Sequence, residues 1–303
     1  MDWSSARQGF KVYLKLERSL SGNSIEAYMH DLDMLMDYLD QHKINCAPEN
    51  MLPETLEAFV LFISGLGIAA SSQARIISGI KAFYKYLLIE DEIDTNPTEL
   101  LEGPKLQRKL PDTLHYEEIK QILGVIDLSR PEGMRNRTML EVLYSSGLRV
   151  SELINLKLSN LHLEVGFIKV QGKGNKERLV PIGSDAIKYI NLYRNEVRVH
   201  IAVKKEDADV LFLNRRGGKL SRVMVFKIIK NAVLKAGINK NISPHTFRHS
   251  FASHLVDGGA GLRAVQEMLG HESITTTEIY THLDMGYLRD TILRYHPRNS
   301  GGE

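Results

Sequence analysis

Several features that would each indicate a class of protein are scarce or missing in this sequence. Its 303 residues include a single cysteine, Cys46, so no disulfide can form within the chain, as is usual in a reducing cytoplasm. The longest apolar run, residues 58–70, contains a serine and two glycines and is shorter than the ~20 residues that span a bilayer. The N-terminus does not open on the apolar stretch of a secretion signal. We therefore expect a soluble, cytoplasmic protein with no membrane insertion.

The sequence also lacks the motifs of several catalytic classes. It has 11 histidines, but no His-Glu-x-x-His segment and no cysteine pair, so we predict no catalytic metal. His245 and His249 are four residues apart, which alone does not make a metal site. A Gly-x-Ser-x-Gly elbow and a Gly-x4-Gly-Lys-Ser/Thr phosphate loop are both absent. These absences argue against a serine hydrolase and a P-loop enzyme, and we expect no cofactor.

Charge is nearly balanced overall, at +2, but it is unevenly distributed. Residues 1–100 carry 8 Lys and Arg against 15 Asp and Glu, a net −7, and the other 203 residues carry 31 against 22, a net +9. The basic part of the chain is therefore the C-terminal two-thirds. Much of the early acidity falls on one predicted helix, at Asp31, Asp33, Asp37 and Asp40, and we interpret it as a solvated face.

Hydrophobic spacing divides the chain near residue 105. The first part is predicted to form four helices: residues 4–18, a second that opens at Ser24 with Ser21 also available as a cap, a third after Pro53, and a fourth after residues 71–72. Aromatic residues at helical spacing in the fourth, such as Phe83 and Tyr84, are interpreted as core rather than as a base-stacking surface. Residues 104–111 are rich in proline and basic residues, which is typical of a linker. We therefore place one domain at residues 1–103 and another at 112–303.

The second domain is predicted to be mainly α-helical with a small antiparallel sheet. Short period-2 runs at 161–163, 167–170 and 178–182 are typical of strands. Helical spacing surrounds them, at residues 116–126, 134–146, 150–157, 184–198, 222–236, 245–257, 262–269, 276–282 and 287–295. The last helix has an apolar stripe of Leu288, Ile292 and Tyr295 and is too short to be stable unpacked.

A candidate anion site lies at the start of the helix predicted for residues 245–257. Ser243 followed by Pro244 is typical of a helix N-cap and first turn. His245 and Arg248 are then three apart on one face, at the helix end that favours an anion. The segment alone is equally compatible with a surface helix on which these two side chains only cap or solvate.

Two further cations are candidates, each with an open alternative. Lys173 lies in Gly-Lys-Gly-Asn-Lys between two predicted strands, where it either reaches a substrate or is simply exposed at a hairpin tip. Arg149 lies in Gly-Leu-Arg-Val-Ser-Glu-Leu at the mouth of a helix. It either pairs with Glu152 on the surface or points inward while Glu152 orients its backbone, and spacing does not decide between these.

Tyr280 is the candidate nucleophile. A phenol with a pKa of about 10 is a poor nucleophile near neutral pH and needs cations around its electrophile. The box Thr275-Thr-Thr-Glu278 places Tyr280 in the second turn of a short helix that is marginal by itself.

Taken in order, these segments resemble the tyrosine recombinases, and most closely their bacterial Xer subgroup. The positions that carry the resemblance are Arg149, Lys173, His245, Arg248, His271 in Leu-Gly-His, and Tyr280 in Ile-Tyr-Thr-His. The likeness covers nearly the whole chain. Two departures are Phe247, where leucine is usual, and Gly261, where aspartate is common; neither is a proposed catalytic group.

The resemblance implies a SAM-like four-helix core-binding domain that clamps double-stranded DNA, a linker at 104–111, and an α+β catalytic domain. Tyr280 would attack a DNA phosphate and form a 3′-phosphotyrosyl bond, with neither ATP nor metal required. Arg149, Arg248 and His271 would bind the phosphate oxygens, Lys173 would protonate the departing oxygen, and His245 would act as general base and acid. In the first domain, DNA contacts would come from Lys11, Lys15 and Arg18 or from Arg75, Lys81 and Lys85.

The resemblance also implies a tetrameric synapse with a related second recombinase, and a DNA translocase at the division septum. The last helix would dock on a neighbouring subunit as a subunit-exchange helix. The function expected is resolution of chromosome or plasmid dimers. An integrase of a mobile element would use the same chemistry, but the chain shows no extra N-terminal arm-binding segment. A DNA-binding protein without catalysis is the alternative from another class, and it would not require all six candidate residues.

Overall fold

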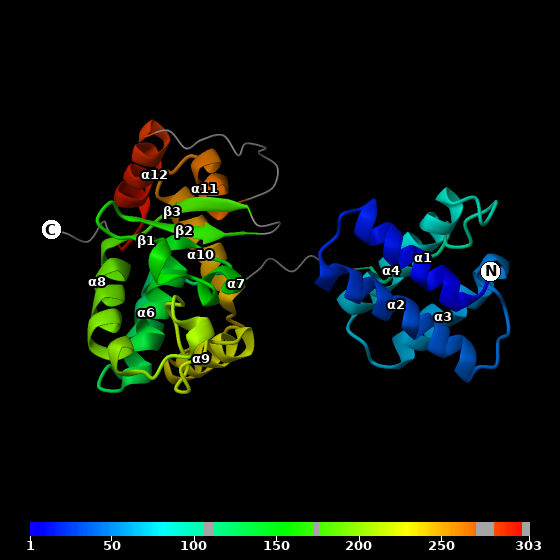
Figure 1. The fold of residues 1–303 in the computed structure, drawn as a ribbon, viewed down its shortest axis with the longest axis horizontal. Coiled ribbons are helices and arrows are strands. Elements are labelled where there is room, and N and C mark those ends of the chain that lie inside the picture. Colours follow the sequence, from blue (N-terminus) through cyan, green and yellow to red (C-terminus); the bar gives the residue numbers. More distant parts are fainter. Residues whose placement is uncertain (106–111, 173–175, 271–281, 299–303) are drawn as a thin grey trace. The chain divides into compact units, whose positions relative to one another are not determined.

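The computed structural model of the chain describes residues 1–105, 112–172, 176–270 and 282–298. The chain divides into two compact units, residues 1–109 and 110–303, each with its own hydrophobic core (Figure 1). The first unit contains α1 (Trp3–Leu16), α2 (Gly22–Gln41), a 3-10 helix (Pro48–Asn50), α3 (Pro53–Gly65) and α4 (Ala70–Ile89). The four α-helices predicted for this part are therefore present. The second begins at Gly22, and the Ser21 hydroxyl caps it by accepting from the Ser24 backbone N–H.

The core of the first unit is aromatic. Phe10, Phe59, Phe83 and Tyr84 are at most 1% exposed, and Phe10 packs edge-on against Phe83 with ring centroids 5.4 Å apart. Helices α2 and α4 pack on each other and both contact α1. The interpretation of these aromatics as core is confirmed.

One prediction about the acidic helix is wrong. Asp31 is only 2% exposed, and its Oδ2 accepts a 2.7 Å hydrogen bond from Arg75 Nη1 across the α2–α4 contact. An α2 face that packs on α4 cannot be solvated along its whole length, and Asp31 falls on the packed side. Because Arg75 forms this ion pair, it is less available as a DNA contact than the sequence suggested. Asp37 and Asp40 are exposed as predicted.

The second unit is mainly helical around a small sheet. Its first helices are α5 (Tyr116–Gly124), α6 (Pro131–Ser146) and α7 (Val150–Ile154), and then come β1 (Leu161–His162), β2 (Phe167–Gln171) and β3 (Glu177–Pro181). They are followed by α8 (Ser184–Leu192), a π-helix (Tyr193–Val197), α9 (Arg222–Lys235), α10 (Pro244–Asp257), α11 (Leu262–Leu269) and α12 (His282–Tyr295). Short 3-10 helices lie at Leu158–Asn160, Arg198–His200 and Lys205–Asp207.

The sheet is antiparallel, in the order β1-β2-β3. Ile168 of β2 pairs with Leu161 of β1 on one side and with Val180 of β3 on the other. The fold class expected from the sequence, mainly α with a small antiparallel sheet in the second domain, is confirmed. Residue 173, which was expected at the β2–β3 turn, lies outside the described residues.

Helix α6 runs through the centre of the second unit. Its residues from Thr138 to Ser146 are all buried, and it packs against α8 and α10. A helix buried all round provides a rigid base for the elements packed on it. It ends at Gly147, whose φ of 58° is the left-handed conformation that glycine adopts at low cost, and the chain then turns directly into α7.

Helix α12 packs on its own domain. Leu288 and Ile292 are each 1% exposed and belong to the core of the second unit, where α12 contacts α10, α11 and β3. The sequence suggested instead that this stripe docks on a neighbouring subunit. The same stripe finds its apolar partner within the chain, which satisfies the need for packing that motivated the suggestion.

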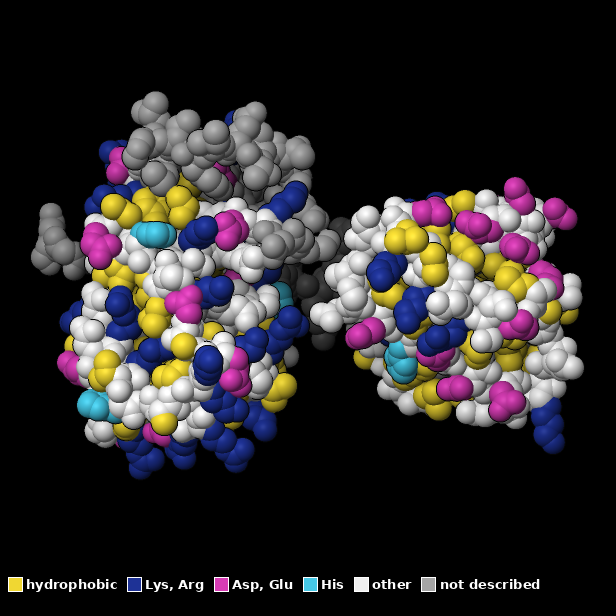
Figure 2. All heavy atoms as spheres, viewed as in Figure 1, with side chains coloured by type: hydrophobic (Ala, Val, Ile, Leu, Met, Phe, Trp, Pro, Cys, Tyr) yellow, Lys and Arg dark blue, Asp and Glu magenta, His cyan; other side chains and the backbone are white. Residues whose placement is uncertain are grey.

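Surface charge differs between the units. On the face drawn in Figure 2, Lys and Arg gather at the lower end of the second unit, where α9 lies in Figure 1. Helix α9 carries Arg222, Lys227, Lys230 and Lys235. Among the described residues, no helix is both long and apolar enough to cross a membrane.

Candidate active site

The start of α10 has the local structure that its sequence predicts. Ser243 is the N-cap, Pro244 is the first helical residue, and the Ser243 hydroxyl accepts from the Thr246 backbone N–H. The Thr246 hydroxyl accepts in return from the Ser243 backbone N–H at 3.1 Å, which completes a capping box. The two reciprocal bonds fix the first turn of α10 and therefore the directions of His245 and Arg248.

A cavity of about 440 Å³ opens beside this turn. His245 and Arg248 both line it, together with Asp112, Asn241, Ser243, Thr246, His249, Ala252 and Leu269. His245 is exposed whereas Arg248 is buried, so the cavity has an exposed imidazole and a buried cation in its lining. The reading in which both side chains only solvate the helix does not hold for Arg248.

Arg149 is the N-cap of α7 and is held by Glu152 twice. Its backbone N–H donates to Glu152 Oε2 at 2.8 Å, and its Nη1 donates to Oε1 at 3.0 Å. The Glu152 side chain is 1% exposed and that of Arg149 is 35% exposed, so the pair is anchored on a buried carboxylate rather than lying on the surface. Both alternatives left open by spacing are partly right: the ion pair forms, and Glu152 also orients the Arg149 backbone.

Arg248 is held by carbonyl groups. Its Nη1 donates to Gly147 O at 2.7 Å and its Nη2 to Leu269 O at 2.6 Å. Burial first, and then the positive charge of Arg149, lower the pKa of Arg248 to about 10. A pKa of about 10 still leaves the guanidinium charged near neutral pH, and its acceptors are neutral, so its charge is not cancelled by a bonded carboxylate.

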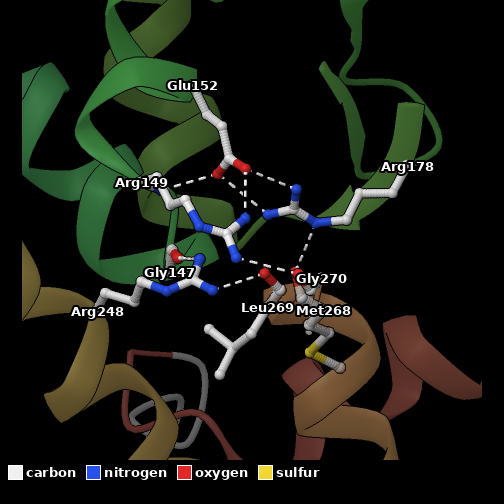
Figure 3. Close-up of polar contacts among 8 residues, drawn as sticks. All are labelled: Gly147, Arg149, Glu152, Arg178, Arg248, Met268, Leu269 and Gly270. Atoms are coloured by element: carbon white, nitrogen blue, oxygen red, sulfur yellow. Dashed lines mark hydrogen bonds and ion pairs between the residues drawn. The ribbon is translucent and has the colours of Figure 1, made fainter. Parts of the chain in front are cut away.

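Arg149 and Arg248 converge on the C-terminal end of α11 (Figure 3). Arg149 Nη2 donates to Gly270 O at 3.0 Å, and Arg248 Nη2 donates to the adjacent carbonyl of Leu269. Two cations from segments about a hundred residues apart therefore bond adjacent backbone carbonyls. An anion with several oxygens suits such a pair, because charge-assisted bonds to guanidinium groups are strong and directional.

A third arginine, which the sequence analysis did not single out, completes the cluster. Arg178 of β3 donates from Nη1 to Glu152 Oε1 at 2.7 Å and from Nη2 to Oε2 at 3.1 Å. Its Nε donates to Met268 O at 3.0 Å. The sequence offered one signal. Alternate residues of a strand face the same side, so Arg178 shares the buried face of β3 with Val180.

Glu152 is the only carboxylate bonded to these arginines within the described residues. Burial tends to raise its pKa, but the hydrogen bonds and charges of Arg178 and Arg149 outweigh burial and hold the pKa below its usual value. Three arginines around one carboxylate leave a positive cluster, which favours binding of an anion at its open side.

Lys173, His271 and Tyr280 lie outside the described residues, as does the predicted capping box before Tyr280. Gly172, which precedes Lys173, and Gly270, which precedes His271, both lie at the arginine cluster. Of the six candidates, the structure brings Arg149 and Arg248 together and places His245 in the cavity beside Arg248. In the portions described, no group of three or more His, Cys, Asp or Glu is arranged to hold a metal ion.

Two family models match the chain: "Phage integrase family" at residues 112–286 and "Phage integrase, N-terminal SAM-like domain" at residues 8–91. The curated proteins named tyrosine recombinase XerD from Chlorobaculum tepidum and Staphylococcus epidermidis are each 44% identical to it. The alignments cover 98% of this chain and 97% of the first relative, and 94% and 96% for the second.

A solved structure of the XerH site-specific recombinase bound to a palindromic difH substrate, in a post-cleavage complex, has the same fold. It is 25% identical, with a TM-score of 0.71, and the match covers 95% of this chain and 84% of that one. The family models, the extent of the identity and the fold agree with one another. The chain therefore belongs to the phage integrase family of tyrosine recombinases and is a site-specific recombination enzyme similar to XerD.

Proposed function

We propose that this enzyme exchanges DNA strands at a specific site through a covalent bond between Tyr280 and the 3′-phosphate. The observation that supports this most directly is the convergence of Arg149 and Arg248 on the carbonyls of Leu269 and Gly270. Those carbonyls are the last described groups before residues 271–281, the segment that carries His271 and Tyr280 in the sequence.

The chemistry balances without an external energy source. The Tyr280 oxygen forms a bond to phosphorus while the bond from phosphorus to the 5′-oxygen breaks. The freed 5′-hydroxyl later attacks the phosphotyrosyl phosphorus of a partner strand, where a new bond from phosphorus to the 5′-oxygen forms and the bond to the tyrosine breaks. One phosphodiester is replaced by another ester at each step, so no ATP is needed, and the proposal assigns stabilisation of the phosphate charge to arginines rather than to a metal ion. His245 accepts the tyrosine proton, and Lys173 donates a proton to the departing 5′-oxygen.

Arg149 and Arg248 bind the non-bridging oxygens of the phosphate in this proposal, and His271 adds a further hydrogen bond. Their task is to stabilise negative charge that grows in the transition state. Removing one donor of this kind typically lowers the rate by ~10²–10³-fold. The neutral carbonyl acceptors around Arg248 support this role, because they fix its guanidinium without neutralising it.

The biological setting that fits best is resolution of chromosome or plasmid dimers at a dif-like site during segregation. XerD names among the relatives and the difH substrate of the XerH complex support this setting. We propose that the first unit grips duplex DNA together with the second, and that the synapse is a tetramer containing a second, XerC-like recombinase. A DNA translocase at the septum would act with it, and the reaction would take place in the cytoplasm, where the chromosome lies.

The test is formation of a covalent adduct on a nicked duplex that carries a dif-like site. Wild-type protein should give an adduct that resists SDS, because the nick lets the 5′-fragment diffuse away and traps the phosphotyrosyl bond. Tyr280→Phe should abolish the adduct and retain DNA binding, since it removes only the nucleophilic oxygen.

A matched control is Tyr189→Phe in α8, which removes a phenolic oxygen away from the proposed site and should leave the adduct intact. An adduct that persists in Tyr280→Phe would show that another residue is the nucleophile. Absence of any adduct with the wild-type protein on dif-like sites would reject the proposed substrate.

A further inference from the structure

Arg178 bonds two separate elements at the arginine cluster. Its side chain is 9% exposed, and its three nitrogens bond Glu152 of α7 and the Met268 carbonyl of α11. It extends from β3, the second arm of the hairpin in which Lys173 lies by sequence. Arg178 therefore connects β3, α7 and α11, three elements that are separate in the chain (Figure 3).

Two glycines lie next to this side chain, and one of them, Gly270, leaves room for it. A Cβ on Gly270 would lie 3.0 Å from Arg178 Cδ, Nε and Cζ, and Gly270 also has a φ of 66°. A Cβ on Gly172 would lie 3.6 Å from Arg178 Nη1 and 3.8 Å from Glu152 Oε1. Gly172 directly precedes Lys173 in the chain, and Gly270 directly precedes His271. The guanidinium thus lies between the last described residues before two of the proposed catalytic groups.

Arg178 also shares its carboxylate with Arg149. Glu152 Oε1 accepts from both Arg178 Nη1 and Arg149 Nη1, and Oε2 accepts from Arg178 Nη2 and the Arg149 backbone N–H. Each carboxylate oxygen therefore bonds both arginines, and the carboxylate cannot shift toward one without straining its bonds to the other. The orientation of Arg149 depends on Arg178 through this shared acceptor.

We propose that Arg178 is a positioning residue for the cleavage reaction, which sets Arg149 through Glu152 and holds the C-terminal end of α11, just before His271 in the chain. The inference rests on the proposed function, because it assigns Arg178 a task in the chemistry assigned to those residues. Arg178 itself need not contact DNA, since its hydrogen bonds within the described residues go to Glu152 and Met268.

Removing Arg178 is predicted to change the pH dependence of cleavage as well as its rate. The charged groups that face Glu152 are Arg149 from α7, Arg178 from β3 and Arg248 from α10. Burial raises the pKa of Glu152, and the two bonded arginines lower it by more. Without Arg178 the effect of burial is opposed less, so Glu152 takes up its proton at higher pH and then loses an acceptor site for Arg149. The acid limb of the cleavage rate should therefore move upward in pH.

The experiment compares Arg178→Gln and Arg178→Lys with a matched control, Arg137→Gln. Arg137 likewise joins a buried carboxylate to a backbone carbonyl, with Nε 2.9 Å from Glu141 Oε1 and Nη1 2.7 Å from Leu123 O. Glu141 keeps a second partner, Arg298, just as Glu152 would keep Arg149. Each variant is assayed for melting temperature, DNA affinity and single-turnover adduct formation on nicked duplex across pH.

Arg178→Gln should bind DNA and form adduct about 10²-fold more slowly, the loss expected when a catalytic group is displaced by about 1 Å. Its acid limb should shift upward. Arg178→Lys keeps the charge but not the two-pronged geometry. The acid limb of its cleavage rate should therefore shift less, while its rate of adduct formation stays low. Arg137→Gln should cleave at the wild-type rate when folded.

A folded Arg178→Gln that matches Arg137→Gln in rate, or that keeps the wild-type acid limb, overturns the proposal. If Arg178→Gln does not fold, Arg178→Lys decides by the same rate criterion. If the wild-type protein forms no adduct, the proposed function fails instead, so the two failures are distinguishable.

Discussion

At the scale of single residues, Arg248 illustrates how a buried cation remains available to a substrate. Its two hydrogen bonds go to the neutral carbonyls of Gly147 and Leu269. A carboxylate partner would hold the guanidinium as firmly but would cancel the charge that a phosphate needs. Arg149 and Arg178 are different, since they share Glu152, and the cluster keeps a net positive charge because three guanidinium groups surround one carboxylate.

His296 is a second buried ionisable group, just beyond α12. It is 0% exposed, packs against Tyr144 and Phe251, and accepts at Nδ1 from the Arg298 backbone N–H. Burial lowers the pKa of His296 to about 3. The folded chain therefore keeps this imidazole neutral, whereas the unfolded chain protonates it near its ordinary value of about 6.5.

His296 should make the second unit less stable in mild acid. Its contribution is fully present above pH ~6.5 and is lost as the pH falls from there toward the folded value, because only the unfolded chain binds the proton. Between pH 8 and pH 5.5 the wild-type protein should lose about 1.4 kcal/mol more unfolding free energy than His296→Gln. The measurement is urea unfolding followed by circular dichroism. Fluorescence of Trp3, the single tryptophan, identifies the transition of the first unit. An equal loss in both proteins would contradict the prediction.

The residue-level site could be predicted only in part. Arg149, His245 and Arg248 stand in recognisable local contexts, and the structure brings them to one region. Arg178 was missed because its importance comes from partners on α7 and α11, which no local pattern reveals. Asp31 was misread for a similar reason, since its burial depends on the packing of α4 against α2.

At the scale of elements, the turn from α6 into α7 determines the site. Gly147 ends α6 in the left-handed conformation, its carbonyl accepts from Arg248, and Arg149 follows two residues later. A Cβ on Gly147 would lie 2.4 Å from Phe251 Cδ1 and 3.1 Å from Leu269 Cδ2. Close packing therefore requires glycine here, in addition to the backbone conformation.

Gly147→Ala should destabilise the second unit and slow cleavage together. The left-handed backbone alone costs about 1–2 kcal/mol for a residue with a Cβ, and overpacking against Phe251 adds roughly 1–3 kcal/mol. Displacing the Gly147 carbonyl should also loosen Arg248. The control is Gly124→Ala at the end of α5, where a Cβ would meet nothing within 4 Å, and which should be neutral or slightly stabilising. Melting temperature and adduct rate check both; a wild-type melting temperature for Gly147→Ala would contradict the argument.

Local signals predicted elements well where the cap was in the sequence. Ser243-Pro244 predicted the start of α10. The start of α6 was missed, because this helix begins at Pro131, three residues before the predicted start. The helix expected at 184–198 is instead α8 followed by a π-helix at Tyr193–Val197. Tyr193 is fully buried, stacks on Phe212 and accepts from the Leu213 backbone N–H, which are tertiary contacts that periodicity does not register.

Helix α12 shows that an apolar stripe predicts packing but does not identify the packing partner. Its stripe predicted a packing partner correctly, but the partner in this chain is the core of the second unit. Removing α12 would uncover that core, so a truncation after His282 would test folding as much as assembly. Tyr287 and Leu293, which are 56% and 47% exposed, remain on its outer side as the apolar residues available to a neighbouring subunit.

At the scale of the whole molecule, the acidic first unit must present cations selectively if it is to grip DNA. Of the two candidate sets, Lys11, Lys15 and Arg18 are exposed, and within the described part of the chain none of them forms an ion pair. In the α4 set, Arg75 is bonded to the buried Asp31. Among the residues that the structure describes, the first set therefore keeps all three of its cations unpaired and exposed, whereas the α4 set keeps only two unpaired, Lys81 and Lys85, and Lys81 is partly buried.

Replacing Lys11, Lys15 and Arg18 together by alanine should weaken DNA binding and reduce its salt dependence. Each phosphate contact contributes about 0.9 to the slope of log K against log salt concentration, so three lost contacts should lower its magnitude by about 2.7. The matched control is Lys81→Ala with Lys85→Ala in α4, which should change the slope little. Titrations of a dif-like duplex over a range of salt concentrations measure both. If the α4 pair reduces the slope and the α1 triple does not, DNA contacts α4 and the assignment is reversed, because counterion release counts only the cations that reach phosphate.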